Sequence, residues 1–155
     1  MKTQHPFARI LPLLCLGFSH ITSAQAQPAL PATGNLTLRI QNVESAEGMV
    51  WVGMYNSADT FLNEEKAVKV QGVKVTSAGE VRMSLTDLPF GEYAIALFHD
   101  VNNSGRLDQN WVGIPQEPYG FSGGFTKKWR APYYSEVVFR FSASGQTLPL
   151  KLGKW

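Results

Sequence analysis

Cysteine and histidine are nearly absent from the part of the chain that we expect to fold. The 155 residues include one cysteine, Cys15, and three histidines. Cys15 and two of the histidines lie before residue 27, in a segment with the features of a cleavable signal. Removal of that segment leaves neither a disulfide nor a thiol nucleophile, and it leaves His99 as the only histidine. A zinc site built from several His and Cys ligands is therefore excluded.

The chain also lacks an apolar stretch long enough to cross a bilayer. The stretch from Ile10 to Ile21 has 12 residues, whereas a membrane-spanning helix needs about 20. Two basic residues come before it or at its start, and Ala24-Gln25-Ala26 follows, which is the pattern of a secretory signal. We expect residues 1–26 to be removed on export to the periplasm or out of the cell. Residues 27–33 are predicted to be a flexible lead-in and residues 34–155 a single domain.

Charge of one sign is not in excess. Without the signal, twelve basic and twelve acidic residues remain, so the mature net charge is zero. Proteins that bind nucleic acid or anionic membranes usually carry clustered positive charge. Neither is an expected partner, and no transmembrane segment is expected after signal removal.

Helical patterns are also scarce. The sequence has instead short segments in which apolar and polar residues alternate. Only 57–67 has a helical pattern, of one or two turns. Seven segments have the period-2 pattern or the β-branched and aromatic content of strands: 36–40, 49–55, 68–75, 80–85, 92–98, 136–141 and 146–152. The fold class predicted is all-β, an antiparallel immunoglobulin-like or transthyretin-like sandwich of about seven strands. Segments 36–40 and 49–55 are predicted to form one hairpin, and the last two segments another.

One stretch, 101–134, contains no convincing strand or helix. Its 34 residues exceed the usual loop length of about 15 residues at most. It is rich in aromatic residues, which disordered segments lack: Trp111, Tyr119, Phe121, Phe125, Trp129, Tyr133 and Tyr134. We predict one long irregular loop that folds over an end or a face of the sandwich.

The start of this loop has the spacing of a calcium-binding loop. Asp100, Asn102, Ser104 and Asp108 occupy positions 1, 3, 5 and 9, Gly105 occupies the turn at position 6, and Arg106 at position 7 offers its backbone carbonyl. Position 12 is Trp111, where an EF-hand has a bidentate glutamate. A turn at Gly113-Ile114-Pro115 can instead return Glu117 as the missing ligand. The alternative is ordinary turn chemistry, because Asn, Asp, Ser and Gly also favour tight connections without a metal.

The aromatic residues and His99 have two interpretations each. Four aromatic side chains of the loop can form a platform for a ligand, or they can pack against one another as a small hydrophobic core of the loop itself: Trp111, Tyr119, Phe121 and Trp129. His99 can contact a ligand, bind a metal or act as a general base beside Asp100 or Glu117, or it can position the loop from the strand end. A lone histidine outside a recognisable catalytic motif favours the second interpretation.

The strings LPFGEYAIAL and FHDVNNSGRLDQNWVGIPQEPYGFSGG resemble domain-of-unknown-function family 2141 of bacterial exported proteins. The resemblance covers about Leu36 to Leu152 and is most specific from Phe98 to Ser122. It implies a secreted or periplasmic β-rich domain and no established activity. Ser104 departs from the Asn or Asp that relatives often have there.

The function predicted from the sequence is that of an exported β-sandwich binding or interaction module, with calcium as the candidate cofactor at 100–108. Its expected partner is an envelope or extracellular protein or a carbohydrate. Two alternatives stay open. One is a small periplasmic hydrolase that acts on a carbohydrate or ester, and the other is a structural envelope module without a small ligand.

Overall fold

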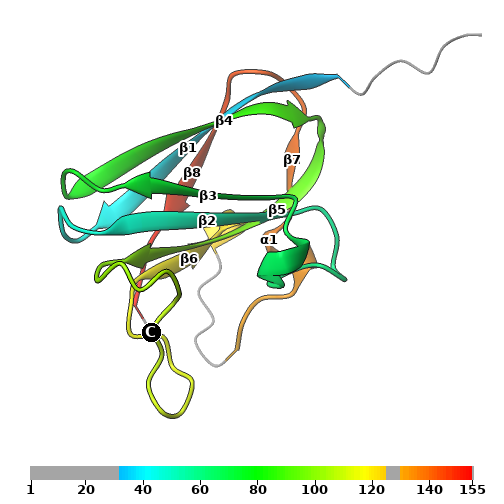
Figure 1. Ribbon diagram of the computed structural model, residues 1–155. Coiled ribbons are helices and arrows are strands. Elements are labelled where there is room, and N and C mark those ends of the chain that lie inside the picture. The colour runs from blue at the N-terminus through cyan, green and yellow to red at the C-terminus, as the bar shows by residue number, and fades with distance from the viewer. Residues whose placement is uncertain (1–31, 125–129, 155) are drawn as a thin grey trace, which may run out of the picture.

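The described part of the protein is a two-layered β structure (Figure 1). The computed structural model describes residues 32–124 and 130–154. The predicted signal at 1–26, the lead-in up to residue 31 and Trp129 lie outside the described residues.

The first layer is a sheet of three strands in the order β4-β1-β8. The central strand β1 (Thr33–Val43) runs antiparallel to β4 (Gly79–Pro89) and parallel to β8 (Gln146–Lys151).

The second layer has five strands. Four follow the order β3-β2-β5-β6, and all of their pairings are antiparallel: β3 (Lys69–Lys74), β2 (Met49–Tyr55), β5 (Gly91–Asp100) and β6 (Tyr119–Phe121). The short strand β7 (Phe139–Phe141) pairs with the first residues of β5.

Within residues 32–124 and 130–154, helical structure is confined to single turns. The 3-10 turns are η1 (Glu64–Lys66) and η2 (Ser122–Gly124), and α1 (Tyr134–Val137) is one turn of α-helix. Among the described residues, no helix has the length and apolar content that a membrane crossing requires.

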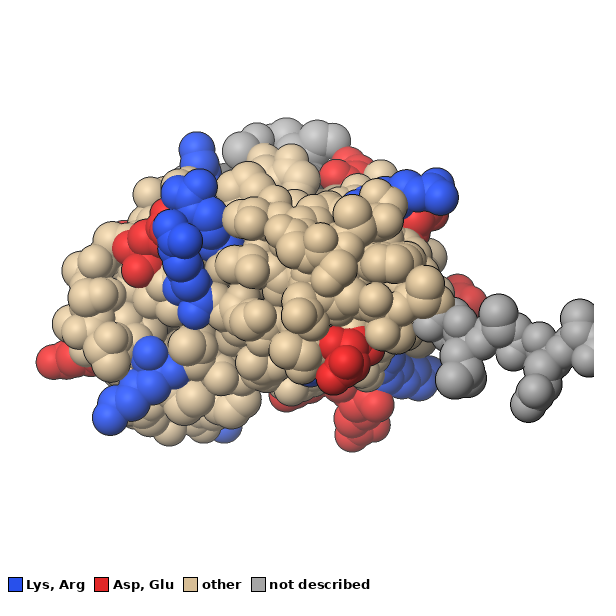
Figure 2. All heavy atoms as spheres, turned by 90° about the horizontal axis from the view of Figure 1, so that it is seen from above, with Lys and Arg blue, Asp and Glu red and all other residues tan. Residues whose placement is uncertain are grey.

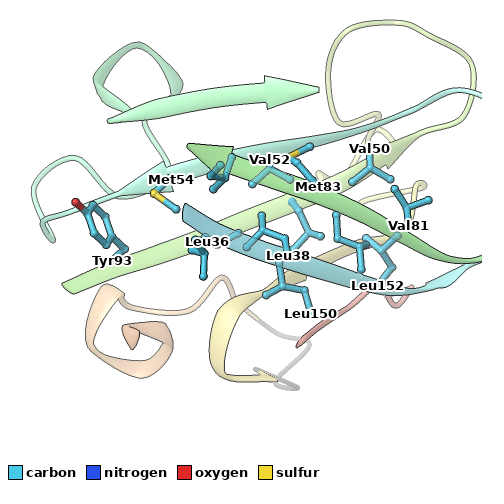
Figure 3. Packing of buried hydrophobic residues seen from close by; sticks show 14 of the residues in the cluster. Leu36, Leu38, Val50, Val52, Met54, Val81, Met83, Tyr93, Leu150 and Leu152 are labelled. Atoms are coloured by element: carbon cyan, nitrogen blue, oxygen red, sulfur yellow. The ribbon is translucent and has the colours of Figure 1, made fainter. Parts of the chain in front are cut away.

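One hydrophobic core lies between the two sheets (Figure 3). Alternate residues of β1 point into it, and Leu36, Leu38 and Ile40 are completely buried. Val50 and Val52 of β2 face them from the other sheet. This is the period-2 burial that one apolar face per strand produces.

The two sides of the sandwich are closed in different ways. On one side Tyr119 of β6 and Gly153 exchange both backbone hydrogen bonds, at 2.9 Å each, which joins the sheets through the main chain. Gly120 permits this approach, because a Cβ there would lie 2.2 Å from the carbonyl oxygen of Lys151. On the other side only side chains of β3 reach β4; the Lys69 ammonium, for example, donates to the Thr86 carbonyl at 3.4 Å.

The predicted sandwich class is confirmed, but both predicted hairpins are wrong. Strands β1 and β2 belong to different sheets, and β8 pairs with β1 while β7 pairs with β5. Two alternating strands bury the same residues whether they pair side by side or face each other across a core, so periodicity alone cannot distinguish the two arrangements. The predicted irregular loop also contains β6, and the predicted helix at 57–67 is reduced to η1.

Charged side chains of both signs lie close together on the surface. Glu80 accepts hydrogen bonds from Arg39 at 2.7 Å and from Arg82 at 3.0 Å, and the bond from Arg39 lowers the pKa of Glu80 to about 2. In Figure 2 the face seen from above has charges mostly toward its two ends, with a broad uncharged area between them. This face therefore has no large patch of one sign.

We expect the core face of β1 to dominate stability. Leu38→Ala should lower the free energy of unfolding by about 2–5 kcal/mol, because it removes transfer energy and leaves a cavity. The matched change Leu62→Ala, at a side chain that is 43% exposed, should cost less than about 1 kcal/mol. Urea unfolding followed by circular dichroism measures both, and equal losses would contradict this account of the core.

Candidate functional site

Asp100 is the last residue of β5 and is completely buried. Its Oδ1 accepts a hydrogen bond from the Ser104 amide at 2.9 Å, and its Oδ2 accepts one from the Gly105 amide at 2.8 Å. Oδ2 also accepts the indole N–H of Trp51 at 3.3 Å. Gly48 packs against this strand end, because a Cβ on Gly48 would lie 2.0 Å from the Asp100 carbonyl oxygen. Asp100 thus organises the loop that follows it.

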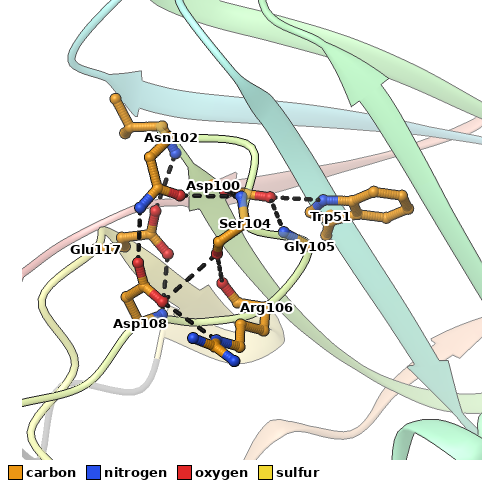
Figure 4. A network of polar contacts seen from close by, with 9 residues as sticks. Trp51, Asp100, Asn102, Ser104, Gly105, Arg106, Asp108 and Glu117 are labelled. Carbon is orange, nitrogen blue, oxygen red and sulfur yellow. Dashed lines mark hydrogen bonds and ion pairs between the residues drawn. The ribbon is translucent and has the colours of Figure 1, made fainter.

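The next polar side chains of the loop converge on Asp108 (Figure 4). The Asn102 amide nitrogen donates to Asp108 Oδ2 at 2.7 Å. The Ser104 hydroxyl lies 3.0 Å from the Arg106 carbonyl oxygen and 3.5 Å from Asp108 Oδ1. The structure therefore brings loop positions 3, 5, 7 and 9 together, as their spacing predicts.

Glu117 returns to this loop from the far end of the connection. A turn held by Asn110, whose side-chain oxygen accepts the amides of Val112 and Ile114, reverses the chain before it. Glu117 is almost buried; its Oε1 accepts the Val101 amide at 3.0 Å, and its Oε2 accepts the Asp108 amide at 3.1 Å. It connects the first and last parts of the loop.

The oxygen atoms of this cluster have limited capacity for a cation. Asp100 Oδ2 already accepts two protein N–H groups, whereas Asp100 Oδ1 and each Glu117 oxygen accept one. Asp100 Oδ1, the Glu117 oxygens and the Asp108 carboxylate therefore retain lone pairs. Within 32–124 and 130–154, no three His, Cys, Asp or Glu side chains are grouped so that they alone could hold a metal. A calcium ion here would therefore need Asn102, Ser104 and the Arg106 carbonyl as well.

A groove of about 650 Å³ lies beside the loop, on the outer face of the five-stranded sheet. Gly53 and Ala96 are cross-strand partners that line it. The Tyr55 ring packs over Gly53, where a Cβ would lie 2.9 Å from the Tyr55 hydroxyl, and Ala96 forms the floor. The next pair along the same strands, Trp51 and Phe98, stands beside them, and Phe121 of β6 pairs with Ala96. The outer face of β2 and β5 is therefore apolar as well as the inner one.

Tyr119 and Tyr55 contribute phenol rings to this groove. Tyr119 packs edge-on against Phe121 with 5.9 Å between ring centroids. Burial raises the pKa of Tyr119 and of Tyr55, and the nearby Glu64 carboxylate adds to the shift at Tyr55. Both hydroxyls are therefore neutral at physiological pH, and these walls carry no charge.

The opposite wall comes from the loop itself, through residues from Arg106 to Pro115. Trp51 lines the groove and also donates to Asp100, so one side chain connects the groove to the candidate calcium loop. Trp111 does not line the groove and is 95% exposed at the loop tip.

His99 lies apart from the groove. It points into the interior, is completely buried, and its Nε2 is 2.8 Å from the Glu47 carbonyl oxygen. Because a carbonyl only accepts, Nε2 carries the proton, and His99 Nδ1 has no hydrogen-bond partner among the described residues. A side chain without solvent contact cannot meet a substrate, so this position favours the interpretation in which His99 holds the strand end.

Residues 120–124, Gly-Phe-Ser-Gly-Gly, fit the spacing of a nucleophile elbow, a signal that the sequence analysis did not use. Ser122 is completely buried; its hydroxyl donates to the Val137 carbonyl and accepts the Ile95 amide at 2.9 Å. It joins η2 to β5 and α1 in the role of a structural hydrogen-bonding group.

Of the predicted aromatic platform, Tyr119 and Phe121 line the groove, Trp111 lies outside it, and Trp129 is outside the described residues. Sequence reasoning missed Trp51 and Phe98. The available signal was the apolar content of both faces of β2 and β5, which predicts that something covers the outer face.

We expect Glu117 to stabilise the loop as an acceptor of two amides. Glu117→Gln should lower the free energy of unfolding by about 1–3 kcal/mol. The side-chain NH₂ group of the glutamine would face a backbone N–H, and an NH₂ group cannot accept its hydrogen bond. Glu65→Gln, at an exposed side chain, is the matched control and should change stability by less than about 0.5 kcal/mol. Thermal unfolding of both variants measures the two stabilities, and equal values would contradict the role of Glu117 as an acceptor of two amides.

Neither the curated proteins nor the solved structures contain a match to the chain. A family model described as "Uncharacterized protein conserved in bacteria (DUF2141)" matches residues 38–148. That match spans β1 to β8 and includes both the loop and the groove. The chain therefore belongs to the bacterial family DUF2141.

Proposed function

We propose that the protein is an exported binding module whose binding site is the groove between the outer face of β2, β5 and β6 and the loop at 106–115. The observation that carries the proposal is the groove itself. Its volume of about 650 Å³ lies within the range of about 300–1,000 Å³ that is usual for ligand sites. Its floor at Ala96 lacks a large side chain, and its walls are aromatic. Such a site favours a flat apolar or aromatic group, or the apolar face of a sugar ring, on a protein or carbohydrate partner.

The position of His99 and Ser122 supports binding over hydrolysis. Both side chains are completely buried and both are engaged with backbone groups. A general base and a nucleophile must reach the substrate. The groove is lined mainly by apolar side chains, which suits recognition better than acid–base chemistry.

Calcium has a place in this proposal as the group that holds the loop wall. Binding at Asp100, Asn102, Ser104, the Arg106 carbonyl and Asp108 would replace the bond from Asn102 to Asp108 with contacts to the ion. With two or three carboxylates in reach, the expected dissociation constant is roughly 0.1–1 mM, which is typical of extracellular sites. Trp51 would transmit the state of the Asp100 carboxylate to the groove.

Binding in the groove is tested with the aromatic dye 8-anilinonaphthalene-1-sulfonate, by fluorescence titration of the purified protein. Ala96→Leu fills the floor of the groove and should weaken dye binding by about tenfold or more, which is about 1.4 kcal/mol. Ala78→Leu makes the same change at an exposed turn and should leave the affinity unaltered. Equal affinities for the two variants, or no binding by the native protein, would overturn the groove as the site.

Calcium binding is tested by the melting temperature in EDTA and in a calcium series. A dissociation constant near 1 mM predicts that about 10 mM calcium stabilises the folded state by about 1.4 kcal/mol, seen as a rise of a few degrees. Asp108→Asn should remove most of this rise, and Asp59→Asn, at an exposed carboxylate, should preserve it. If the native protein melts at the same temperature throughout, the loop oxygens act only in turn formation.

A further inference from the structure

The most exposed large apolar side chain of the described protein is Trp111, which is 95% accessible. Val112 beside it is 53% accessible. The turn that carries them is well held, because Asn110 accepts the Val112 and Ile114 amides through its side chain and the Gly113 amide through its carbonyl. A rigid tip with an exposed indole has the character of an interface hot spot, since tryptophan is enriched among residues that dominate binding energy.

The groove on the same face of the molecule is apolar, as a site for an indole side chain must be. Val112 and Ile114 line the groove on the loop side, so the exposed tip and the groove form one continuous apolar surface. The floor at Ala96 leaves space between the walls for a side chain that enters from outside. Trp111 does not occupy this space in its own chain.

The charges at the groove rim favour a second copy of the chain as the occupant. Arg106 is on the loop wall, with 82% of its side chain exposed, and it has only a long contact of 3.5 Å with Asp108. Glu64, in η1, is an exposed residue that lines another part of the rim. When a protruding group and its receptor lie on one face, a two-fold axis satisfies both sites at once and buries the whole patch. A two-fold arrangement with the loop wall of each copy over the η1 side of the other would bring Arg106 and Glu64, which have opposite charges, together. The mature net charge of zero adds no repulsion between copies.

We propose that two copies of the protein dock face to face, with Trp111 of each in the groove of the other. The free protein masks its binding groove in this way, and a groove ligand competes with the second copy. The inference rests on the proposed function only in that both use the same groove. Its consequence is that dimer formation and ligand binding exclude each other.

Sedimentation equilibrium of the purified protein over about 1–200 μM tests the proposal directly. The native protein should sediment as a monomer–dimer mixture. Trp111→Ala should be monomeric at every concentration, Trp111→Phe should retain the dimer, and Ala96→Leu should lose it because the receptor is filled. Val68→Ala, at an exposed apolar side chain outside the groove, is the control and should behave as the native protein.

Dye titration separates this inference from the proposed function. Trp111→Ala leaves the lining of its own groove unchanged, so it should bind 8-anilinonaphthalene-1-sulfonate at least as tightly as the native protein, and the dye should shift native dimer to monomer. A native protein that stays monomeric, or a Trp111→Ala variant that still dimerises, overturns the self-docking. If the monomeric native protein binds the dye and Ala96→Leu does not, the groove stands as a site for another partner. If neither the native protein nor Trp111→Ala binds the dye, while the native protein still forms a dimer that Trp111→Ala does not form, the proposed groove function is wrong and the dimer interface is supported.

Discussion

The buried carboxylate of Asp100 is the constraint on which the loop and the groove depend. A carboxylate without solvent contact must accept hydrogen bonds from the protein, because an uncompensated buried charge is very costly. Two of its three donors are consecutive amides, of Ser104 and Gly105, and the third is the indole of Trp51. The first two bend the chain back over the strand end. The third attaches that bend to the outer face of the sheet, so the path of the loop and the position of one groove wall have the same origin.

The groove also follows from an unusual property of strands β2 and β5. Their inner residues fill the core, and their outer residues include Trp51, Gly53, Ala96 and Phe98. A sheet that is apolar on both faces needs cover on both. The loop supplies cover from one side and Tyr55 covers Gly53, but the small side chain of Ala96 leaves a hollow that the surrounding side chains do not fill. An incompletely covered apolar face is the physical basis for interpreting this protein as a binding module.

Much of this architecture was predictable from local patterns. The alternation at Leu36, Leu38 and Ile40 identified a core strand, and the loop spacing placed Asn102, Ser104 and Asp108 together, as the structure has them. The sequence also allowed a turn at 113–115 to return Glu117 to the loop, where it accepts the Val101 and Asp108 amides. The groove was not predicted, because it is made by residues from four strands, η1 and the loop, and no local pattern records which strands are neighbours. The exposure of Trp111 was left open for a similar reason: an aromatic residue in a loop packs inward or outward according to what the rest of the chain places beside it.

Sequence alone determined the properties that depend on neighbours along the chain. These are the alternation of strands, the absence of disulfides, and the oxygen-rich turn from Asp100 to Asp108, where spacing within nine residues brings the polar side chains together. Strand order, the parallel pairing of β1 with β8, and the burial of His99 and Ser122 came from the tertiary structure. The reason is energetic: apolar faces are buried equally well by several pairings, and the choice among them depends on the packing of the whole core and the closure of both sheet edges.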